Sequence, residues 1–416
     1  MSNTPMTPRN VAIVGAGPAG LFAAEIIAAA GHRVTIYERM PSPARKFLLA
    51  GRGGLNLTHS EPIENFLTRY GPDAEKVRAI VEGFPPSALI DWANGLGAET
   101  FIGSSGRVFP RAMKASPLLR AWLRRLNEMG VIIKTRHRWS GFTPEGGHSF
   151  ETPEGAIAIS PDASLFALGG ASWPKLGSDA LWVETFKNAG IPVTPLEPAN
   201  CGVLISWSEI FRSRFEGAAL KRIAVNCAGA TTRGEVIVTK TGLEGGAIYA
   251  LIPQLRSALR AQQSVTLSID LKPDVEHSVL AERLAKPRGK ETLTNFLRKA
   301  AHLDPPALAL LREAGTSLPA EADTLATRIK SVPLNVNGLS RIDRAISTAG
   351  GIDWAALSGD LMIRERPGMF AAGEMLDWEG PTGGYLLQAT FATATHAATG
   401  LLTWLASTGS ETSPHH

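Results

Sequence analysis

Cysteine is scarce in this chain of 416 residues, which contains only Cys201 and Cys227. Neither belongs to a Cys-x-x-Cys pair, so the sequence excludes a metal site or a redox motif built on paired cysteines. A single disulfide is one alternative. We expect instead two buried free thiols in a reducing compartment.

Long runs of one charge sign are also absent. The net charge is +4, the calculated pI is about 9.1, and charged residues make up 19% of the chain. No block of Lys and Arg marks a nucleic-acid-binding tail. We therefore expect a small-molecule substrate and no nucleic-acid partner; the sequence leaves the oligomeric state open.

A continuous apolar stretch long enough for a membrane span is missing as well. Residues 386–406 are fairly apolar, but Gln388, His396 and several Thr interrupt them. This pattern favours a buried helix and predicts no membrane partner. The segment before Val11 is polar and contains proline, unlike a signal peptide. We therefore expect a cytoplasmic protein.

What the sequence does contain is a glycine motif near its start. An apolar run, Val11–Val14, is typical of a buried parallel strand. Gly15, Gly17 and Gly20 follow, and an Ala-rich segment over residues 21–30 is predicted to be a helix. In this pattern the glycines permit a tight turn, close approach of a pyrophosphate, and close helix–strand packing. The helix N-terminus then offers free N–H groups to phosphate.

The context of this motif supports a dinucleotide site. A second strand is predicted over Arg33–Tyr37, and Glu38 follows it at the place where an acid meets a ribose hydroxyl. An acid there favours a free 2′-OH. The alternative is a glycine turn with a solvated Glu38. The motif fits NAD or FAD, and downstream features favour FAD.

A second glycine loop follows, over residues 51–58. Arg45, Lys46 and Arg52 bring positive charge to it, and closely spaced glycines permit close approach of the backbone to another group. We interpret the loop as a holder of pyrophosphate and flavin. The alternative is a glycine turn between surface elements.

The middle of the chain changes in pattern after prolines 192, 195 and 198. Short strand-like runs predict a small antiparallel sheet or barrel. Three short helices are predicted over residues 277–284, 290–297 and 306–313. A nucleotide-binding pattern resumes near Val332, with a glycine loop predicted at residues 346–352. Residues 369–374 are predicted to be a strand that ends in Gly-Glu, and residues 380–385 lead into the last helix.

We therefore predict an α/β protein with a discontinuous, Rossmann-like FAD-binding domain of glutathione-reductase-like layout that carries inserted β-rich and small helical domains. The predicted boundaries are 1–195 and 332–409 for the FAD-binding domain, 196–275 for the β-rich insertion, 276–331 for the helical insertion, and 410–416 for a disordered tail.

Taken together, the motifs resemble a known family. The chain is similar to the BaiN/YhiN-like, or aminoacetone-oxidase-like, bacterial FAD flavoproteins of the two-dinucleotide-binding-domain superfamily. The resemblance covers essentially the whole chain. It rests on residues 15–20, on Arg45-Lys46 with residues 51–58, on residues 348–351, and on residues 372–374 with 382–385.

The resemblance implies roles for cofactor-binding residues, which we give as expectations. The pyrophosphate is assigned to Gly15, Ala16, Gly17, Pro18, Ala19 and Gly20; the adenosine to Glu38, Arg39, Trp139 and Gly169; the phosphate and flavin to Arg45, Lys46, Gly51, Arg52, Gly53, Gly54 and Asn56; and the ribityl chain and flavin to Gly373, Glu374, Gly383, Gly384 and Tyr385.

One departure is visible: Leu55 stands where many relatives have cysteine, which excludes a cysteine beside the flavin. His59, Tyr385 and Lys175 are candidate catalytic residues, although a lone histidine is more often structural, and the catalytic acid or base stays unknown. Trp173 and Pro174 shape a substrate pocket or simply pack.

The first functional hypothesis is an FAD-dependent oxidoreductase acting on a small organic substrate such as an amine, ketone or enone. A second clear Gly-x-Gly-x-x-Gly is absent, so NAD(P)H would bind transiently or O₂ would serve as oxidant. The alternative is a non-enzymatic flavin-binding sensor or assembly partner. Flavin-dependent RNA modification is a third hypothesis, which the missing basic tract disfavours.

Overall fold

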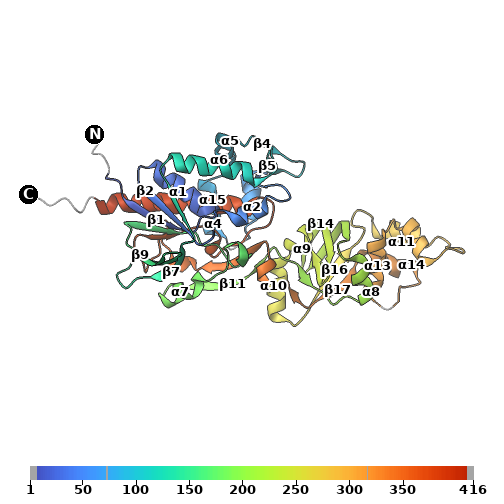
Figure 1. Ribbon diagram of the computed structural model, residues 1–416. Coiled ribbons are helices and arrows are strands. Elements are labelled where there is room, and N and C mark those ends of the chain that lie inside the picture. Colours follow the sequence, from blue (N-terminus) through green and yellow to red (C-terminus); the bar gives the residue numbers. More distant parts are fainter. Residues whose placement is uncertain (1–6, 72–73, 316, 410–416) are drawn as a thin grey trace, which may run out of the picture. The chain divides into compact units, whose positions relative to one another are not determined.

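The computed structural model describes residues 7–71, 74–315 and 317–409 (Figure 1). The chain divides into two compact units. The first contains residues up to 197 and from 347 onward, and the second contains residues 198–346. The predicted tail, 410–416, lies outside the described residues. The predicted division of the insertion at residues 275/276 is finer than these two units and stays a prediction.

The first unit is built on a five-stranded parallel sheet. Its strand order is β20-β10-β1-β2-β6, and every neighbouring pair is parallel. The strands are β1 (Asn10–Val14), β2 (Arg33–Glu38), β6 (Ile132–Thr135), β10 (Ala163–Phe166) and β20 (Met369–Ala371). Residues 11–14 and all of β10 are buried, as expected for central parallel strands. This confirms the predicted Rossmann-like fold class.

Two helices of this sheet layer come from opposite ends of the sequence. α1 (Pro18–Ala29) packs against α15 (Tyr385–Gly409), so the last helix completes the domain that the first helix begins (Figure 1). Gln388 of α15 is buried and donates to the Phe84 carbonyl at 2.6 Å. Among the described residues no helix is both long and apolar enough to cross a membrane.

The other elements of the first unit are short. Its helices are α2 (Arg45–Ala50), α3 (Ile63–Thr68), α4 (Glu75–Gly83), α5 (Pro86–Gly95), α6 (Ala115–Glu128) and α7 (Trp182–Asn188), with 3-10 turns η1 (Pro174–Leu176), η3 (Trp354–Ala356) and η4 (Gly373–Met375). Two small sheets are β3 (Thr58–His59) with β5 (Arg107–Pro110) and β4 (Thr100–Ile102), and β7 (Arg138–Phe142) with β8 (His148–Thr152) and β9 (Gly155–Ile159).

One predicted glycine loop is a strand. Ser347–Ile352 forms β19, which pairs with β11 (Val193–Ala199) and is buried along its whole length. A Cβ on Gly350 would lie 2.2 Å from the Pro195 carbonyl oxygen, and one on Gly351 would lie 2.5 Å from Leu376 backbone. The glycines therefore serve close packing of β19 here, and the prediction of a loop was wrong.

The second unit contains a seven-stranded antiparallel sheet, as the short strand-like runs predicted. Its order is β17-β16-β13-β14-β15-β12-β18. The strands are β12 (Val203–Leu204), β13 (Ala219–Cys227), β14 (Ala230–Thr239), β15 (Gly242–Glu244), β16 (Val265–Asp270), β17 (Val332–Val336) and β18 (Gly338–Leu339). Three helices, α8 (Glu209–Phe215), α9 (Gly246–Tyr249) and α10 (Ile252–Ala261), and the 3-10 turn η2 (Ile342–Arg344) accompany it.

Four helices, not the predicted three, complete the second unit. They are α11 (His277–Leu284), α12 (Leu293–Ala300), α13 (Pro305–Glu313) and α14 (Ala322–Lys330). Leu280, Leu297 and Leu311 share one buried apolar cluster with sheet residues such as Val225. The helices and the sheet of this unit are therefore held by one common core.

Candidate functional site

The glycine turn after β1 forms the floor of the candidate site. A Cβ on Gly15 would lie 2.4 Å from the Ala167 carbonyl oxygen, and one on Gly20 would lie 1.9 Å from the Gly15 carbonyl oxygen. A Cβ on Gly17 would meet nothing within 4 Å. Gly17 is the N-cap of α1, and Pro18 occupies the first turn. Gly15 and Gly20 therefore serve packing, whereas Gly17 leaves open space at a helix N-terminus, which favours an anion.

Glu38 lies directly beside this turn. Its side chain is at the end of β2, and the residue is only 8% exposed. Oε2 accepts from the Ala16 N–H and Oε1 from the Met40 N–H, both at 2.8 Å. Burial raises the pKa of Glu38, and these backbone N–H groups and nearby Arg39 and Arg45 oppose that shift. Each oxygen keeps acceptor capacity for a ligand hydroxyl.

Residues 169–179 form another side of the candidate site, next to Glu38. Arg39 pairs with Asp179 at 2.5 Å and donates to the Pro174 carbonyl at 3.0 Å. A Cβ on Gly177 would lie 4.0 Å from Glu38 Oε1, and one on Gly169 would lie 3.3 Å from Ser178 Oγ. The Ser178 hydroxyl is buried and has no hydrogen-bond partner in the described part of the chain. The sequence did not predict that Gly177, Ser178 and Asp179 belong to this site, because only the fold brings this segment close to Glu38 and Arg39.

Trp139, predicted to flank the adenosine, lies in β7. Its ring is packed among Phe142, Phe166 and Phe186, with centroid separations between 5.0 and 5.7 Å. Its indole Nε1 is buried and has no hydrogen-bond partner among the residues that the structure describes. The side chain thus serves the apolar core of the first unit, and the assignment of Trp139 to the adenosine stays a prediction.

Lys46 and Glu374 meet across 328 positions of sequence. Lys46 Nζ lies 2.6 Å from Glu374 Oε2 and donates to Ser172 Oγ at 2.5 Å. Glu374 Oε1 accepts from the Thr348 N–H at 3.0 Å, and the Thr348 hydroxyl accepts from the Ala171 N–H at 2.9 Å. This network ties α2, β19, η4 and the turn after β10 together. Thr348 was a predicted motif residue, whereas Ser172 was missed.

The predicted glycine loop at residues 51–58 follows α2, a helix that includes Arg45 and Lys46. A Cβ on Gly51 would lie 2.7 Å from Ala115, whereas Gly53 has open space around it. The Gly54 position faces Met113 Cε at 2.8 Å. Gly51 therefore serves packing against the start of α6.

Several buried polar atoms in and around this loop lack a partner within the described part of the chain. They are Asn56 Oδ1, Thr58 Oγ1 and the Nε atoms of Arg39 and Arg45. Arg45 Nη1 donates to Ser42 Oγ at 3.2 Å, and Arg52 is exposed. Buried polar atoms are normally hydrogen-bonded, so this group is suited to a polar ligand.

The start of α15 is fixed against β3. Gly384 has a φ of +103°, and a Cβ there would lie 2.5 Å from Thr58 backbone. Gly383 has a φ of +120°. These two glycines therefore let the helix begin close to the second glycine loop.

Tyr385, the first residue of α15, is held by a polar network. Its hydroxyl donates to Glu61, which Arg69 binds at 2.7 and 3.1 Å, and its carbonyl accepts from the Tyr70 hydroxyl at 2.7 Å. His59 stacks on its ring at 5.6 Å. Burial and Glu61 raise the pKa of Tyr385, and Arg69 lowers that of Glu61. Tyr385 is therefore a neutral, oriented phenol; its catalytic role and that of His59 stay predictions.

The remaining candidates lie apart from these networks. Lys175 is exposed on η1, where Trp173 and Pro174 precede it. Cys201 and Cys227 are free and buried, as predicted, and burial raises the pKa of Cys201 to about 11. Within the described ranges no group of three or more His, Cys, Asp or Glu is arranged to hold a metal ion.

Comparison with known proteins shows similarity over most of the chain. The family model described as HI0933-like protein Rossmann domain matches residues 9–400. The 3-dehydro-bile acid delta(4,6)-reductase of Clostridium scindens is 26% identical over 407 residues, covering 92% of this chain and 96% of that protein. The ribosomal RNA dihydrouridine synthase of Escherichia coli is 24% identical over 401 residues, covering 94% and 97%.

Solved structures share the fold. A flavocytochrome c3 fumarate reductase in its open conformation superimposes with a TM-score of 0.53 at 16% identity, covering 96% of this chain and 79% of that one. The 3-ketosteroid-delta4-(5alpha)-dehydrogenase of Rhodococcus jostii gives 0.50 at 14% identity, covering 97% and 99%. These matches establish the α/β architecture with its inserted second unit.

Proposed function

The chain belongs to the HI0933-like Rossmann family, as the motifs indicated, and from that premise we propose an FAD-dependent oxidoreductase that adds hydrogen across a carbon–carbon double bond conjugated to a carbonyl group. The observation that carries the cofactor assignment is the open space at Gly17. It lies beside the carboxylate of Glu38, while Gly15 and Gly20 are closed by packing.

The residues present fit FAD. The N-terminus of α1 at Gly17 would take the pyrophosphate and Glu38 the ribose hydroxyls. The unpartnered Asn56 Oδ1 and Thr58 Oγ1 offer acceptors, and Arg45 offers a donor, for the polar edge of the flavin and its phosphates. The N-terminus of α15 would stabilise negative charge on the reduced ring. When bound, FAD supplies two-electron transfer as a hydride.

The substrate class rests on the two relatives. A delta(4,6)-reductase and a dihydrouridine synthase are both named for adding hydrogen across a carbon–carbon double bond. In a 3-oxo steroid and in uracil that bond is conjugated to a carbonyl. Such a carbonyl draws electron density from the double bond, which makes its far carbon the hydride acceptor.

The proposed reaction balances with NAD(P)H as the reductant. The nicotinamide loses a hydride, one proton comes from solvent or a side chain, and both add to the double bond. The residues of this chain orient the reactants and exclude water. The Tyr385 phenol is neutral and fixed by Glu61, so we propose that it positions the start of α15.

The test is anaerobic reoxidation of the reduced holoprotein. A cyclic enone is mixed with it, and the saturated ketone of the same ring serves as the matched control. We expect the flavin spectrum to return with the enone only. Reduction of the oxidised protein by an aminoketone, with no response to the enone, would instead identify an amine oxidase. A flavin that no donor reduces would indicate a sensor.

A further inference from the structure

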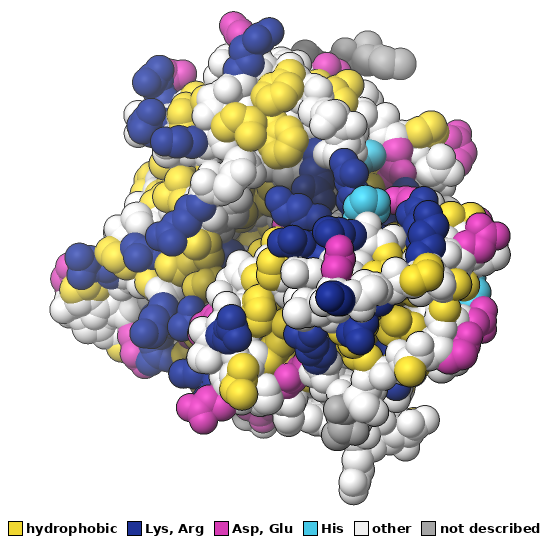
Figure 2. All heavy atoms as spheres, turned by 90° about the vertical axis from the view of Figure 1, so that its right-hand side faces the viewer, with side chains coloured by type: hydrophobic (Ala, Val, Ile, Leu, Met, Phe, Trp, Pro, Cys, Tyr) yellow, Lys and Arg dark blue, Asp and Glu magenta, His cyan; other side chains and the backbone are white. Residues whose placement is uncertain are grey.

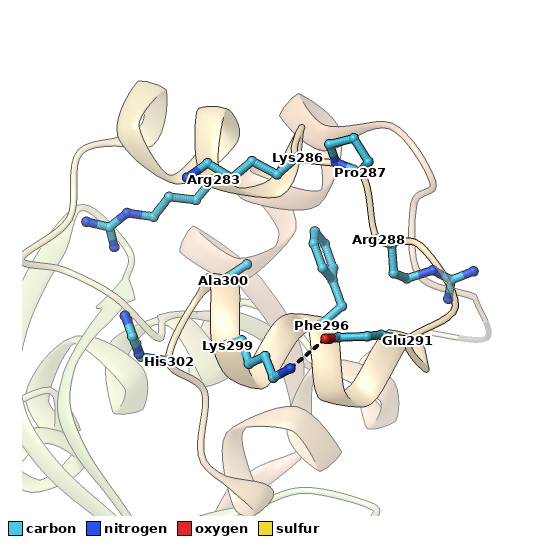
Figure 3. Close-up of a pocket in the computed structure, with 9 residues that line it drawn as sticks. All are labelled: Arg283, Lys286, Pro287, Arg288, Glu291, Phe296, Lys299, Ala300 and His302. Atoms are coloured by element: carbon cyan, nitrogen blue, oxygen red, sulfur yellow. Dashed lines mark hydrogen bonds and ion pairs between the residues drawn. The ribbon is translucent and has the colours of Figure 1, made fainter.

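A basic hollow of about 400 Å³ lies among the helices of the second unit. It is formed by α11, α12 and the loop between them, with His302 just after α12 (Figure 3). The residues that line it are Arg283, Lys286, Pro287, Arg288, Glu291, Phe296, Lys299, Ala300 and His302. The face turned toward the viewer in Figure 2 shows Lys and Arg side chains gathered together, with histidine among them.

Most of the positive charge in this hollow is not neutralised by the protein. Lys299 pairs with Glu291 at 2.5 Å, and Glu291 is the one carboxylate among the lining residues. Within the described chain, the side chains of Arg283, Lys286 and Arg288 make no hydrogen bond or ion pair. These three side chains therefore leave the rim of the hollow positively charged, which attracts an anion.

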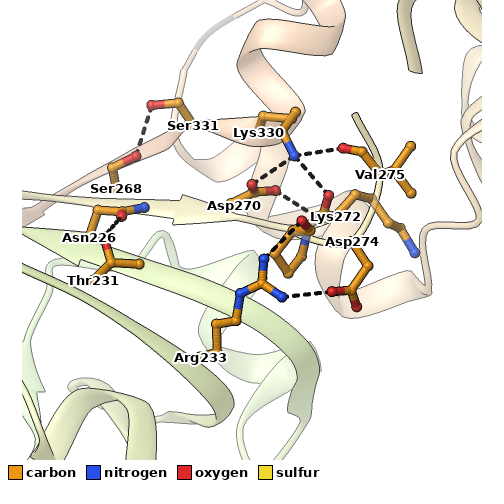
Figure 4. Close-up of polar contacts among 11 residues, drawn as sticks. Asn226, Thr231, Arg233, Ser268, Asp270, Lys272, Asp274, Val275, Lys330 and Ser331 are labelled. Atoms are coloured by element: carbon orange, nitrogen blue, oxygen red, sulfur yellow. Dashed lines mark hydrogen bonds and ion pairs between the residues drawn. The ribbon is translucent and has the colours of Figure 1, made fainter. Parts of the chain in front are cut away.

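Some cations elsewhere in the same unit have well-defined structural partners. Lys330 lies 2.8 Å from Asp270 and also donates to the carbonyls of Lys272 and Val275 at 2.9 and 2.8 Å (Figure 4). Arg233 pairs with Asp274 at 2.8 Å. The Lys330 contacts fix α14 to the loop after β16, and the Arg233–Asp274 pair ties β14 to the same loop.

An aromatic ring lies within the basic hollow. Phe296 is half-buried on α12 and packs partly on the core of the unit. In Figure 3 its ring points from α12 toward the loop that carries Lys286 and Pro287. A free phosphate or an acidic peptide would use the cations and would not need the aromatic ring. Cations that neutralise phosphates around an aromatic ring that can stack on a base are typical of single-stranded nucleic-acid sites.

We propose that this hollow binds single-stranded nucleic acid, with Arg283, Lys286 and Arg288 on phosphates of one strand and Phe296 against a base. The proposal goes beyond the proposed function and does not depend on the flavin. The sequence alone predicted no nucleic-acid partner because it offers no contiguous basic tract. These three cations are only two or three positions apart, at a helix end and in the loop after it, and the fold adds Lys299 and Phe296 of α12 to the same hollow.

Fluorescence anisotropy with the full chain tests the proposal. The probe is a labelled single-stranded RNA of roughly 12 nucleotides, within the size of known single-strand sites, and a DNA of the same sequence is the second arm. We expect binding that weakens steeply with salt. In the triple variant R283Q/K286Q/R288Q the affinity should fall by about tenfold or more, and the slope of log K against log salt should shrink by about two.

A matched triple variant, K221Q/K240Q/R341Q, removes the same charge from exposed positions of the same unit outside the hollow. It should stay within about twofold of the wild type, since it loses only long-range attraction. Equal weakening of both triple variants would overturn the proposal in favour of general attraction to net charge. Unchanged binding by R283Q/K286Q/R288Q would also overturn the proposal. Circular dichroism is the control that checks whether each variant is folded.

The role of Phe296 is tested by F296L, which keeps apolar volume for the core but removes the ring face. We expect roughly five- to a hundredfold weaker oligonucleotide binding, the usual effect of losing one stacking platform. A displaced probe in the presence of oligoglutamate, together with unchanged binding by F296L, would instead identify an acidic protein partner. The affinities measured with the RNA and the DNA of the same sequence decide which nucleic acid is the ligand.

Discussion

At the scale of single residues, the turn after β1 gives its three glycines different tasks. Gly15 and Gly20 are closed by the Ala167 and Gly15 carbonyl oxygens, whereas Gly17 faces open space. A methyl group on Gly17 is therefore tolerated by the protein itself and would conflict only with a ligand that approaches the backbone.

This difference gives a paired test. G17A should change the free energy of unfolding of the apoprotein by less than about 1 kcal/mol, a usual value for an N-cap change. It should weaken FAD binding by roughly tenfold or more, which corresponds to about 1.4 kcal/mol of lost contact.

G20A is the counterpart, because its methyl group would lie 1.9 Å from a carbonyl oxygen. It should destabilise the fold by about 1–3 kcal/mol or more. Urea unfolding with and without FAD separates the two effects. A G17A protein with wild-type FAD affinity would show that the pyrophosphate does not bind at this turn.

The buried histidine His148 makes stability depend on pH. Burial, with a smaller effect of Arg366, lowers the pKa of His148 to about 4, from about 6.5. Between these values the unfolded chain binds a proton that the native chain does not, so stability rises with pH across this window. The contribution of His148 to the free energy of unfolding, about 3 kcal/mol in all, is therefore lost as the pH falls from about 6.5 to 4.

The double variant H148L/S164A tests this, because it removes the titrating ring and also the Ser164 hydroxyl that lies 2.6 Å from His148 Nε2. We expect a smaller difference between urea-unfolding free energies at pH 7 and about pH 4.5 than in the wild type. The same pH dependence in both proteins would show that His148 is not the group responsible.

Residue-level prediction from sequence named most residues of the candidate site but missed some of their polar partners. Gly17 and Glu38 were identified because strand, glycines and acid follow each other at fixed spacing. Ser172, Gly177 and Asp179 carry no such local signal. Their partners Lys46, Glu38 and Arg39 lie more than 100 positions away, so only folding brings them together.

At the scale of elements, the packing of β20 and η4 against α15 positions the candidate site. The Gly373 N–H donates to the Thr393 hydroxyl at 3.0 Å, and the Gly373 carbonyl accepts from the Trp378 indole at 2.8 Å. Thr393 is fully buried on α15. A side chain of the last helix thus satisfies the backbone at the start of η4.

T393V should therefore leave the Gly373 N–H without its acceptor and destabilise the protein by about 1–3 kcal/mol. T403V is the matched control, since Thr403 lies exposed on the same helix and bonds only to the Thr399 carbonyl. It should change stability by less than about 0.5 kcal/mol. Equal midpoints for the two variants in thermal unfolding would contradict the account of this joint.

Elements with a strong pattern were predictable, and the misses have identifiable causes. The central strands β1 and β2 and the last helix follow clear apolar runs. The strand β19 was predicted as a loop because its glycines, with φ of +81° and +144°, usually mark turns. The helix α14 was missed, although Leu325, Ala326 and Ile329 lie on one face and Glu321 caps its N-terminus.

At the scale of the whole molecule, the two units have separate apolar cores. The core of the first contains residues up to Ile191 and from Ile352 onward, and that of the second contains residues from Cys201 to Ala345. The two chain segments that join them are adjacent, since the Ile346 N–H donates to the Asn200 carbonyl at 3.2 Å. Each unit therefore has what an independent domain needs.

Replacement of residues 198–346 by a short Gly-Ser linker tests this independence. We expect a folded protein that still binds FAD, because the residues of the candidate site all belong to the first unit. It should lose oligonucleotide binding, because the basic hollow belongs to the second unit. Calorimetry and flavin absorbance provide the readouts, and an unfolded or aggregated product would contradict the prediction.

The discontinuous α/β organisation could be predicted because a Rossmann pattern stops and resumes in the sequence. The basic hollow was missed, although Arg283, Lys286 and Arg288 lie within six residues, because the chain has no block of consecutive Lys and Arg. The arrangement of α11, its following loop and α12 then adds Lys299 and Phe296 to the same space.

The most direct test of the central claim is the absorbance spectrum of the purified full chain, followed by anaerobic addition of NADH and NADPH. An FAD-dependent oxidoreductase with this site should be yellow, should bleach with one of the two nicotinamides, and should bind FAD more weakly in G17A. A colourless protein that cannot be reconstituted with FAD would contradict the cofactor assignment and the function proposed from it.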